Sequence, residues 1–199
     1  MKILNLYAGI GGNRKLWTDV QVTAVEYDPR IAAVYKDMFP DDELIVGDAH
    51  EYLLQHFTEY DFIWTSPPCQ SHSQMRKNMA VDVRGSKPLY PDMKLYEEII
   101  LLQHYFKGAW VVENVRPYYD YLIEPTFRLG RHPFWSNMPI KDAPYESDGI
   151  KKPGVAITLA ERYGYDLDKY DLPNKRQILR NCVNPEMGKY VIEAIRHAV

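Results

Sequence analysis

Short apolar runs that alternate with helix-like segments constrain the fold of this chain more than any other feature. The runs expected to form strands lie at residues 3–7, 22–26, 44–46, 61–65, 109–112 and 134–140. The segments expected to form helices lie at 12–17, 29–38, 48–54, 92–106 and 185–199. Strands that alternate with helices are typical of βαβ units, whose strands pair in parallel. The sequence therefore predicts an α/β fold with a doubly wound, mainly parallel sheet.

The length of 199 residues suits one domain with a modest insertion. Residues 1–140 carry the alternating pattern and are expected to form the core. Residues 141–176 have weak periodicity and many Pro, Gly, Tyr and Asp residues, which favours an insertion. Residues 177–199 are expected to return to the core, with Asn184 capping a last helix that Pro185 begins. A long polar loop is expected at 71–91, and loops of that length are usually functional.

Composition excludes some classes of protein. No apolar stretch approaches the roughly 18–20 residues of a membrane span, and the N-terminal residues show no signal-peptide pattern. We therefore expect a cytoplasmic protein without a membrane partner, associated with the nucleoid in a prokaryotic or viral context. Cys69 and Cys182 are expected to stay reduced there.

Charge alone does not decide whether the chain binds nucleic acid, because local clusters matter more than the net charge of −3. Basic residues gather in two places. They are Arg76, Lys77, Arg84 and Lys87 in the long loop, and Lys175, Arg176 and Arg180 near the C-terminus.

A glycine-rich turn and two acidic residues follow the first three expected strands. Gly9, Gly11 and Gly12 would let the backbone approach a ligand closely. Glu26 ends the second strand, where a carboxylate can accept hydrogen bonds from ribose hydroxyls, and Asp48 follows the third strand. This pattern favours an adenosyl ligand. A dinucleotide fold would need a third glycine where Arg14 stands, and a tight turn beside exposed strand-end acids is the plainer alternative.

The segment Ser66-Pro67-Pro68-Cys69-Gln70 ends the fourth expected strand. Two prolines stiffen the backbone and orient the thiol that follows them. A thiolate that adds to C6 of cytosine turns C5 into a nucleophile for an electrophilic methyl group. Glu113, at the end of the next long strand, could supply a proton to N3. Each residue alone has a plainer reading, as an inert buried cysteine and a strand-terminal acid.

These segments resemble the C5-cytosine DNA methyltransferases, in the family's motif order and over nearly the whole chain. The matching segments are residues 5–12, 26–29, 47–49, 68–70, 113–115 and 181–183. The resemblance implies a Rossmann-like class I methyltransferase fold with a small recognition insertion. It also implies S-adenosyl-L-methionine as cofactor, S-adenosyl-L-homocysteine as product, no metal, and double-stranded DNA as partner. The target cytosine would have to be flipped out of the stack.

The resemblance also assigns residues to roles. The catalytic residues are Cys69, Glu113 and Arg131. The cofactor-binding residues are Tyr7, Ala8, Gly9, Gly11, Gly12, Glu26, Tyr27, Asp48, Ala49, Pro67 and Asn181. The substrate-binding residues are Pro68, Gln70, Ser73, Arg76, Lys77, Asn114 and Arg128.

Three departures from the family pattern affect these assignments. The usual Gln-x-Arg-x-Arg segment is replaced by residues 128–137, so the role of contacting the base O2 is carried to Arg131, with Arg128 as a rival. Arg180 stands where glycine is usual. Only residues 141–176 could serve as a target-recognition region, which predicts a short or relaxed target sequence, or a homodimer or partner that supplies the missing surface.

Other functions compete with this interpretation. Amino-methyltransferases place an aromatic residue after Pro-Pro, where this chain has Cys69. A tRNA cytosine-5 methyltransferase would use the same residues on another nucleic acid. A non-catalytic module that binds DNA or protein would explain the small recognition region, although every reacting group is present.

Overall fold

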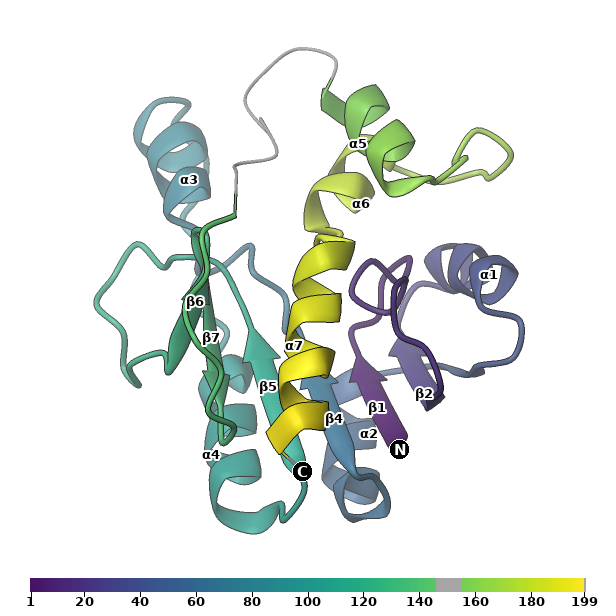
Figure 1. Ribbon diagram of the computed structural model, residues 1–199. Helices are drawn as coiled ribbons and strands as arrows, with labels where there is room; N and C mark the ends of the chain where they lie inside the picture. The colour runs from purple at the N-terminus through teal and green to yellow at the C-terminus, as the bar shows by residue number, and fades with distance from the viewer. Residues whose placement is uncertain (146–154, 199) are drawn as a thin grey trace.

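The computed structural model describes residues 1–145 and 155–198, and its centre is a seven-stranded sheet. The sheet has the order β3-β2-β1-β4-β5-β7-β6 (Figure 1). Its strands are β1 (Lys2–Leu6), β2 (Gln21–Glu26), β3 (Glu43–Val46), β4 (Phe62–Thr65), β5 (Ala109–Glu113), β6 (Phe127–Leu129) and β7 (His132–Ser136). The pairs from β3 to β5 are parallel, and β7 is antiparallel to both β5 and β6. The predicted doubly wound, mainly parallel α/β fold is confirmed.

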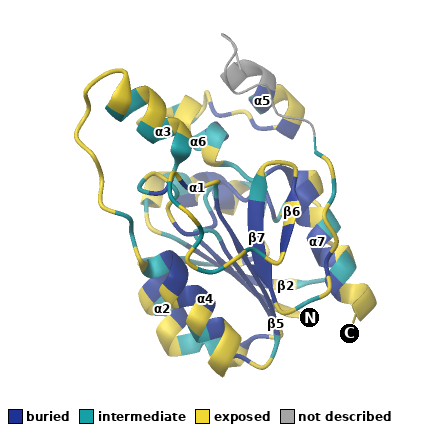
Figure 2. Ribbon diagram, turned by 90° about the vertical axis from the view of Figure 1, so that its left-hand side faces the viewer, coloured by how far each residue is buried: buried dark blue, intermediate teal, exposed yellow. Residues whose placement is uncertain are grey.

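Helices cover both faces of the sheet (Figures 1 and 2). They are α1 (Pro29–Met38), α2 (Ala49–His56), α3 (Gln74–Arg76), α4 (Lys94–Tyr105), α5 (Val155–Tyr163), α6 (Lys175–Asn181) and α7 (Pro185–Ala198), with a 3-10 turn η1 (Phe57–Glu59) and a π-helix η2 (Lys77–Asp82). No helix within the described ranges is long and apolar enough to cross a bilayer.

Alternation along β1 shows how the two faces are built. Ile3 lies in a buried cluster with Val191 and Ile195 of α7. Leu4 and Leu6 belong to the cluster on the other face, with residues of α2 and α4. Successive side chains of a strand point to opposite faces, so an uninterrupted apolar run fits a strand that is covered on both sides.

Side-chain caps fix the starts of three helices. Asp28 accepts a hydrogen bond from the N–H of Arg30 at the start of α1. Asp48 caps α2 by accepting from His50 and Glu51. Asn184 accepts from the N–H of Glu186, and α7 begins at the next residue, Pro185, as predicted. Each cap satisfies backbone donors that have no partner within the helix.

The prediction of a helix at residues 12–17 is wrong, because this segment forms turns. Asn13 exchanges side-chain hydrogen bonds with Asn5, and both side chains are buried. Arg14 forms a two-pronged ion pair with Asp42. These contacts hold the segment against the sheet, and its backbone hydrogen bonds are those of turns, from Lys15 to Gly12 and from Trp17 to Arg14.

The expected loop and insertion contain more regular structure than predicted. The segment 71–91 includes α3 and η2, and the segment 141–176 includes α5 and the start of α6. The strand expected at 134–140 begins at His132 and is the second strand of a hairpin, whose first strand is β6. Gly130 turns this hairpin with a φ of +58°, a conformation that favours glycine.

The strand order reverses between β1 and β4, because chain segments leave these neighbours toward opposite edges of the sheet. Open α/β sheets bind ligands at such a point, outside the carboxyl ends of the strands. Residues 7–12 follow β1 and residues 66–69 follow β4 at this edge. In Figure 1 it is the upper edge, flanked by α3 and α6.

Substituting Gly188→Ala tests how closely α7 packs on the turn at residues 11–17. A Cβ at Gly188 would lie 2.1 Å from the backbone oxygen of Asn13. Alanine in an unobstructed helix would stabilise by about 1 kcal/mol, whereas overpacking costs about 1–3 kcal/mol. We expect net destabilisation in urea unfolding. Gly47→Ala is the control, since nothing lies within 4 Å of its added Cβ. Equal stability of both variants would contradict the close packing.

Candidate active site

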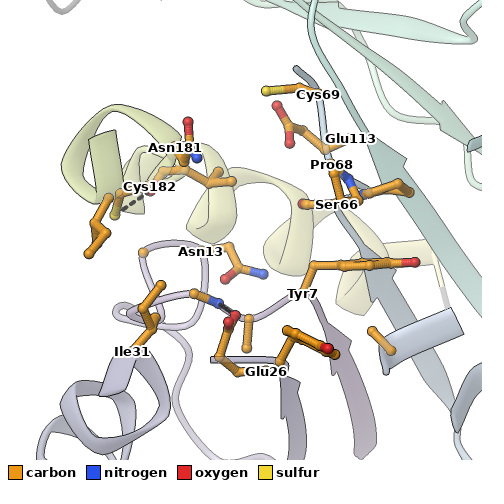
Figure 3. A pocket seen from close by; sticks show the side chains of 18 of the residues that line it. Tyr7, Asn13, Glu26, Ile31, Ser66, Pro68, Cys69, Glu113, Asn181 and Cys182 are labelled. Carbon is orange, nitrogen blue, oxygen red and sulfur yellow. Dashed lines mark hydrogen bonds between the residues drawn. The ribbon is translucent and has the colours of Figure 1, made fainter. Parts of the chain in front are cut away.

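A cavity of about 420 Å³ opens at the carboxyl ends of β1, β2, β4 and β5. This volume lies in the range of small-molecule sites, about 300–1,000 Å³. The cavity is lined by both the glycine-rich turn and the Pro-Pro-Cys segment. Figure 3 shows Glu26 and Tyr7 toward one end, Cys69 and Glu113 at the other, and Asn181 and Cys182 along one side.

The three glycines of the turn are needed for three different reasons. Gly9 has a φ of +55°, and a Cβ there would meet no atom within 4 Å, so its backbone faces open space. Gly11 has a φ of +80°, and a Cβ would lie 2.2 Å from the ring of Phe39. A Cβ on Gly12 would lie 2.2 Å from the backbone oxygen of Val183. Gly9 therefore leaves room for a ligand, while Gly11 and Gly12 allow close packing behind it.

Glu26 is held in place by backbone N–H groups. One carboxylate oxygen accepts from Gly9 at 2.9 Å and the other accepts from Asp28 at 3.0 Å. Burial raises the pKa of Glu26, and these hydrogen bonds offset part of that effect. The carboxylate thus has a fixed position between the glycine turn and the end of β2.

A buried carboxylate joins three segments that contribute residues to the cavity wall. Glu98 of α4 has no exposed surface, and it accepts hydrogen bonds from the hydroxyls of Tyr7 and Thr65, each at 2.6 Å. Nδ1 of His50, in the first turn of α2, lies 3.0 Å from it. The bond to Glu98 raises the pKa of His50, and burial together with the charge of Glu98 raises the pKa of Tyr7. Glu98 therefore ties the ends of β1 and β4 to two helices.

The Cys69 thiol lies at the opposite end of the cavity from Glu26. Asn114 supports its loop by donating from Nδ2 to the backbone oxygen of Pro67 at 3.0 Å. Burial, followed by the charge of Glu113, raises the pKa of Cys69 to about 11. At neutral pH the resting side chain is therefore a protonated thiol.

Glu113 has a second partner besides the thiol. Its Oε1 lies 2.8 Å from Nδ1 of His132, the first residue of β7. The antiparallel register pairs Glu113 with Phe134, so β7 begins beside the end of β5. Both side chains line the cavity. A thiol, a carboxyl group and an imidazole therefore occupy one end of the site.

The structure places most residues predicted to bind the cofactor at the cavity wall. Those that line it are Tyr7, Ala8, Gly9, Gly12, Glu26, Tyr27, Asp48, Ala49, Pro67 and Asn181. Gly11 is the exception, and it packs behind the turn. Cys69 and Glu113, predicted as catalytic, and Pro68 and Gln70, predicted to bind substrate, line the same cavity.

The remaining predicted residues lie elsewhere. Ser73, Arg76 and Lys77 line a smaller neighbouring cavity of about 130 Å³, which Gln70 also reaches. Asn114 is buried behind the Pro-Pro-Cys segment. Arg128 and Arg131 are exposed and line neither cavity.

Sequence reasoning missed five charged or titratable residues that line the main cavity: Asp92, Lys94, His132, Arg180 and Cys182. Lys94 stands 3.4 Å from Asp48 at the start of α4. The helix expected at residues 92–106 already includes Lys94 near its start. His132 could have been found only from the strand register, because the expected strand began two residues later, at Phe134. Arg180 belongs to the C-terminal basic cluster and stands where glycine is usual in the family, and neither feature predicts that it lines the cavity.

Comparisons with known proteins agree with this arrangement. The family described as C-5 cytosine-specific DNA methylase matches residues 1–119. No curated protein sequence matches the chain.

Several solved structures are similar. A variant of DNMT2 from Spodoptera frugiperda is 16% identical with a TM-score of 0.59, and the alignment covers 98% of this chain and 99% of that one. The Entamoeba histolytica methyltransferase EhMeth is 15% identical with a TM-score of 0.38, covering 58% of this chain and 38% of that one. A TehB-like SAM-dependent methyltransferase from Corynebacterium glutamicum is 17% identical with a TM-score of 0.36, covering 56% of this chain and 53% of that one. At these identities, the first likeness shows a common fold.

The raised pKa of Cys69 predicts how its alkylation depends on pH. Only the thiolate reacts, and its fraction rises about tenfold per pH unit below the pKa. The rate of Cys69 modification by iodoacetamide, followed by peptide mass spectrometry, should still rise between pH 9 and 10. An unperturbed thiol, with a pKa of about 8.5, should level off there.

Glu113→Gln is the matched variant, because it removes the charge and keeps the shape of the side chain. The pKa of Cys69 should fall, and alkylation at pH 8 should become several-fold faster. Unchanged kinetics would show that the carboxylate does not act on the thiol.

Proposed function

Since the chain belongs to the C-5 cytosine-specific DNA methylase family, we propose that it methylates C5 of cytosine in double-stranded DNA through a covalent bond between Cys69 and C6. The family consists of methyltransferases that use S-adenosyl-L-methionine. The observation that carries the proposal is that one cavity is lined by Cys69 and Glu113 as well as by Gly9 and Glu26. A methyl donor and a base could therefore meet in it.

The cavity fits the cofactor that the family implies. The backbone of Gly9 faces open space, which a side chain at this position would partly fill. The Glu26 carboxylate is fixed beside it by the Gly9 N–H. Glu26 would accept hydrogen bonds from the ribose hydroxyls, and Asn181 would close the opposite wall. When bound, the cofactor supplies an electrophilic methyl group on a sulfonium centre.

Cys69 and Glu113 would carry out the covalent step together. The sulfur of Cys69 forms a bond to C6, and the thiol proton passes through the Glu113 carboxyl group to N3. This transfer avoids a free thiolate, whose formation the raised pKa of Cys69 disfavours. The product is a neutral enamine with a nucleophilic C5. After methylation a base removes the C5 proton, the S–C6 bond breaks, and the proton on N3 returns through Glu113 to the sulfur, so the one proton released is that of C5.

Reaching C6 requires a base that is out of the stack, since attack comes from the ring face. Flipping costs a few kcal/mol, which contacts to the DNA must offset. The segment from α3 to residue 91 adjoins the cavity and carries Arg76, Lys77, Arg84 and Lys87. We propose that these residues contact phosphates and that the protein acts on DNA in the cytoplasm.

A duplex with 5-fluorocytosine at the target tests the covalent step. Fluorine cannot leave as the C5 proton does, so the wild-type protein should form a stable adduct in the presence of the cofactor. Cys69→Ser should form no adduct and no 5-methylcytosine. Gel shift under denaturing conditions and nucleoside analysis by mass spectrometry measure the two results. A Cys182→Ser variant that still forms adduct is the matched control.

Several outcomes would contradict the proposal. Methylation by Cys69→Ser at the wild-type rate would exclude Cys69 as nucleophile. Methylation of tRNA but not of duplex DNA would show that tRNA is the substrate. N4-methylcytosine or N6-methyladenine among the products would indicate an amino-methyltransferase. DNA binding without any product would indicate a non-catalytic module.

Phosphate contacts predict a salt-dependent affinity. Each contact adds about 0.9 to the slope of log K against log salt concentration. The double variant Arg84→Ala/Lys87→Ala should weaken DNA binding and lower that slope by roughly 1.8. Lys107→Ala is the control, because Lys107 lies just before β5, at the opposite edge of the sheet. Fluorescence anisotropy measures both, and equal slopes for the two variants would exclude the loop contacts.

A further inference from the structure

We infer that His132, rather than Arg131 or Arg128, is the side chain that contacts O2 of the substrate cytosine, next to Glu113. The inference rests on the proposed function and names a residue that sequence reasoning did not assign. His132 lines the cavity, and its Nδ1 lies 2.8 Å from Oε1 of Glu113. The two arginines line no part of it.

The hairpin of β6 and β7 explains why the histidine enters the cavity and the arginines do not. Arg128 lies on the outer strand β6, exposed, with its guanidinium 5.8 Å from the ring centre of Tyr121. Arg131 is exposed at the turn that follows Gly130. β7 begins at His132 and pairs with β5, whose last residue is Glu113. This pairing brings the first side chain of β7 to the end of β5.

The contact with Glu113 fixes the orientation of the imidazole ring. Nδ1 faces Glu113, while Nε2 has no hydrogen-bond partner among the described residues. The side chain is 24% exposed, so it is accessible from the cavity. Glu113 is itself buried, and its contact with His132 uses only Oε1. The pair therefore presents two hydrogen-bonding groups to the same small space.

The edge of cytosine matches this pair. N3 and O2 are neighbours on the ring, so adjacent protein groups can contact both. Glu113 would serve N3, and His132, whose Nδ1 faces Glu113, would donate Nε2–H to O2. Addition of sulfur to C6 moves electron density toward N3 and O2. A donor aimed at O2 is therefore worth more in the transition state than in the ground state.

Kinetics of His132 variants test this contact. His132→Ala should lower kcat for 5-methylcytosine formation by about 10²–10³-fold, with little change in the KM for S-adenosyl-L-methionine. His132→Gln, which keeps an N–H donor, should recover part of the loss. Arg131→Ala and Arg128→Ala should stay within about twofold of the wild-type kcat. Thermal unfolding and cofactor titration verify that each variant is folded and binds cofactor.

A change in the substrate separates contact from positioning. In 2-thiocytosine a sulfur replaces O2 and accepts hydrogen bonds poorly. DNA with this base should slow the wild type but should slow His132→Ala no further. If the thio substitution costs both proteins the same factor, His132 only orients Glu113 and the inference is wrong.

Two further results separate this inference from the proposed function. Wild-type activity with a fully active His132→Ala and a slow Arg131→Ala would overturn the inference alone. A wild-type protein that forms neither 5-methylcytosine nor an adduct would overturn the proposed function and the inference with it.

Discussion

The geometry of the cavity depends on the hydrogen bonds made to the carboxylate of Glu98. A fully buried charge is costly unless hydrogen bonds replace its water, and Glu98 has three such partners, from Tyr7, Thr65 and His50. Those partners lie at the ends of β1 and β4 and at the start of α2. The hydrogen bonds to one carboxylate therefore fix the spacing of these three segments beside the cavity. One side chain thus links the end of β1, which leads to the glycine turn, with the end of β4, which leads to Cys69.

A second carboxylate, that of Glu113, lies at the other end of the cavity. Glu113 is close enough to Cys69 for its charge to help raise the pKa of the thiol, and it also pairs with His132. The resting site therefore keeps the Cys69 thiol protonated and Glu113 paired with His132, which lowers the reactivity of the thiol. Under the proposed function, a bound base would relieve this arrangement, since N3 can receive the thiol proton that the empty site retains.

The sequence predicts the sheet and much of the site because both follow from local patterns. Apolar runs covered on two faces predict strands, and turns or acids directly after them, such as Gly9 and Glu26, must gather at one edge. The helix at 12–17 could not be excluded, because the pairing of Asn13 with Asn5 that prevents it is a tertiary contact. Likewise, which residue of 128–132 enters the cavity depends on a register set by the turn at Gly130. A shift of one residue changes the face on which a side chain lies.

The segment 141–176 is expected to read the target sequence, and part of what the structure describes of it packs on the core. Leu159, Tyr163 and Leu172 lie in a buried cluster with Ile10 and Val34, from the glycine turn and α1. Side chains committed to a core are not available to read base edges. Under the proposed function, sequence discrimination would then also draw on the loop from α3 to residue 91, on the β6–β7 hairpin, or on a second protein. Under the proposed function, this burial leaves fewer side chains of the segment to read a target sequence.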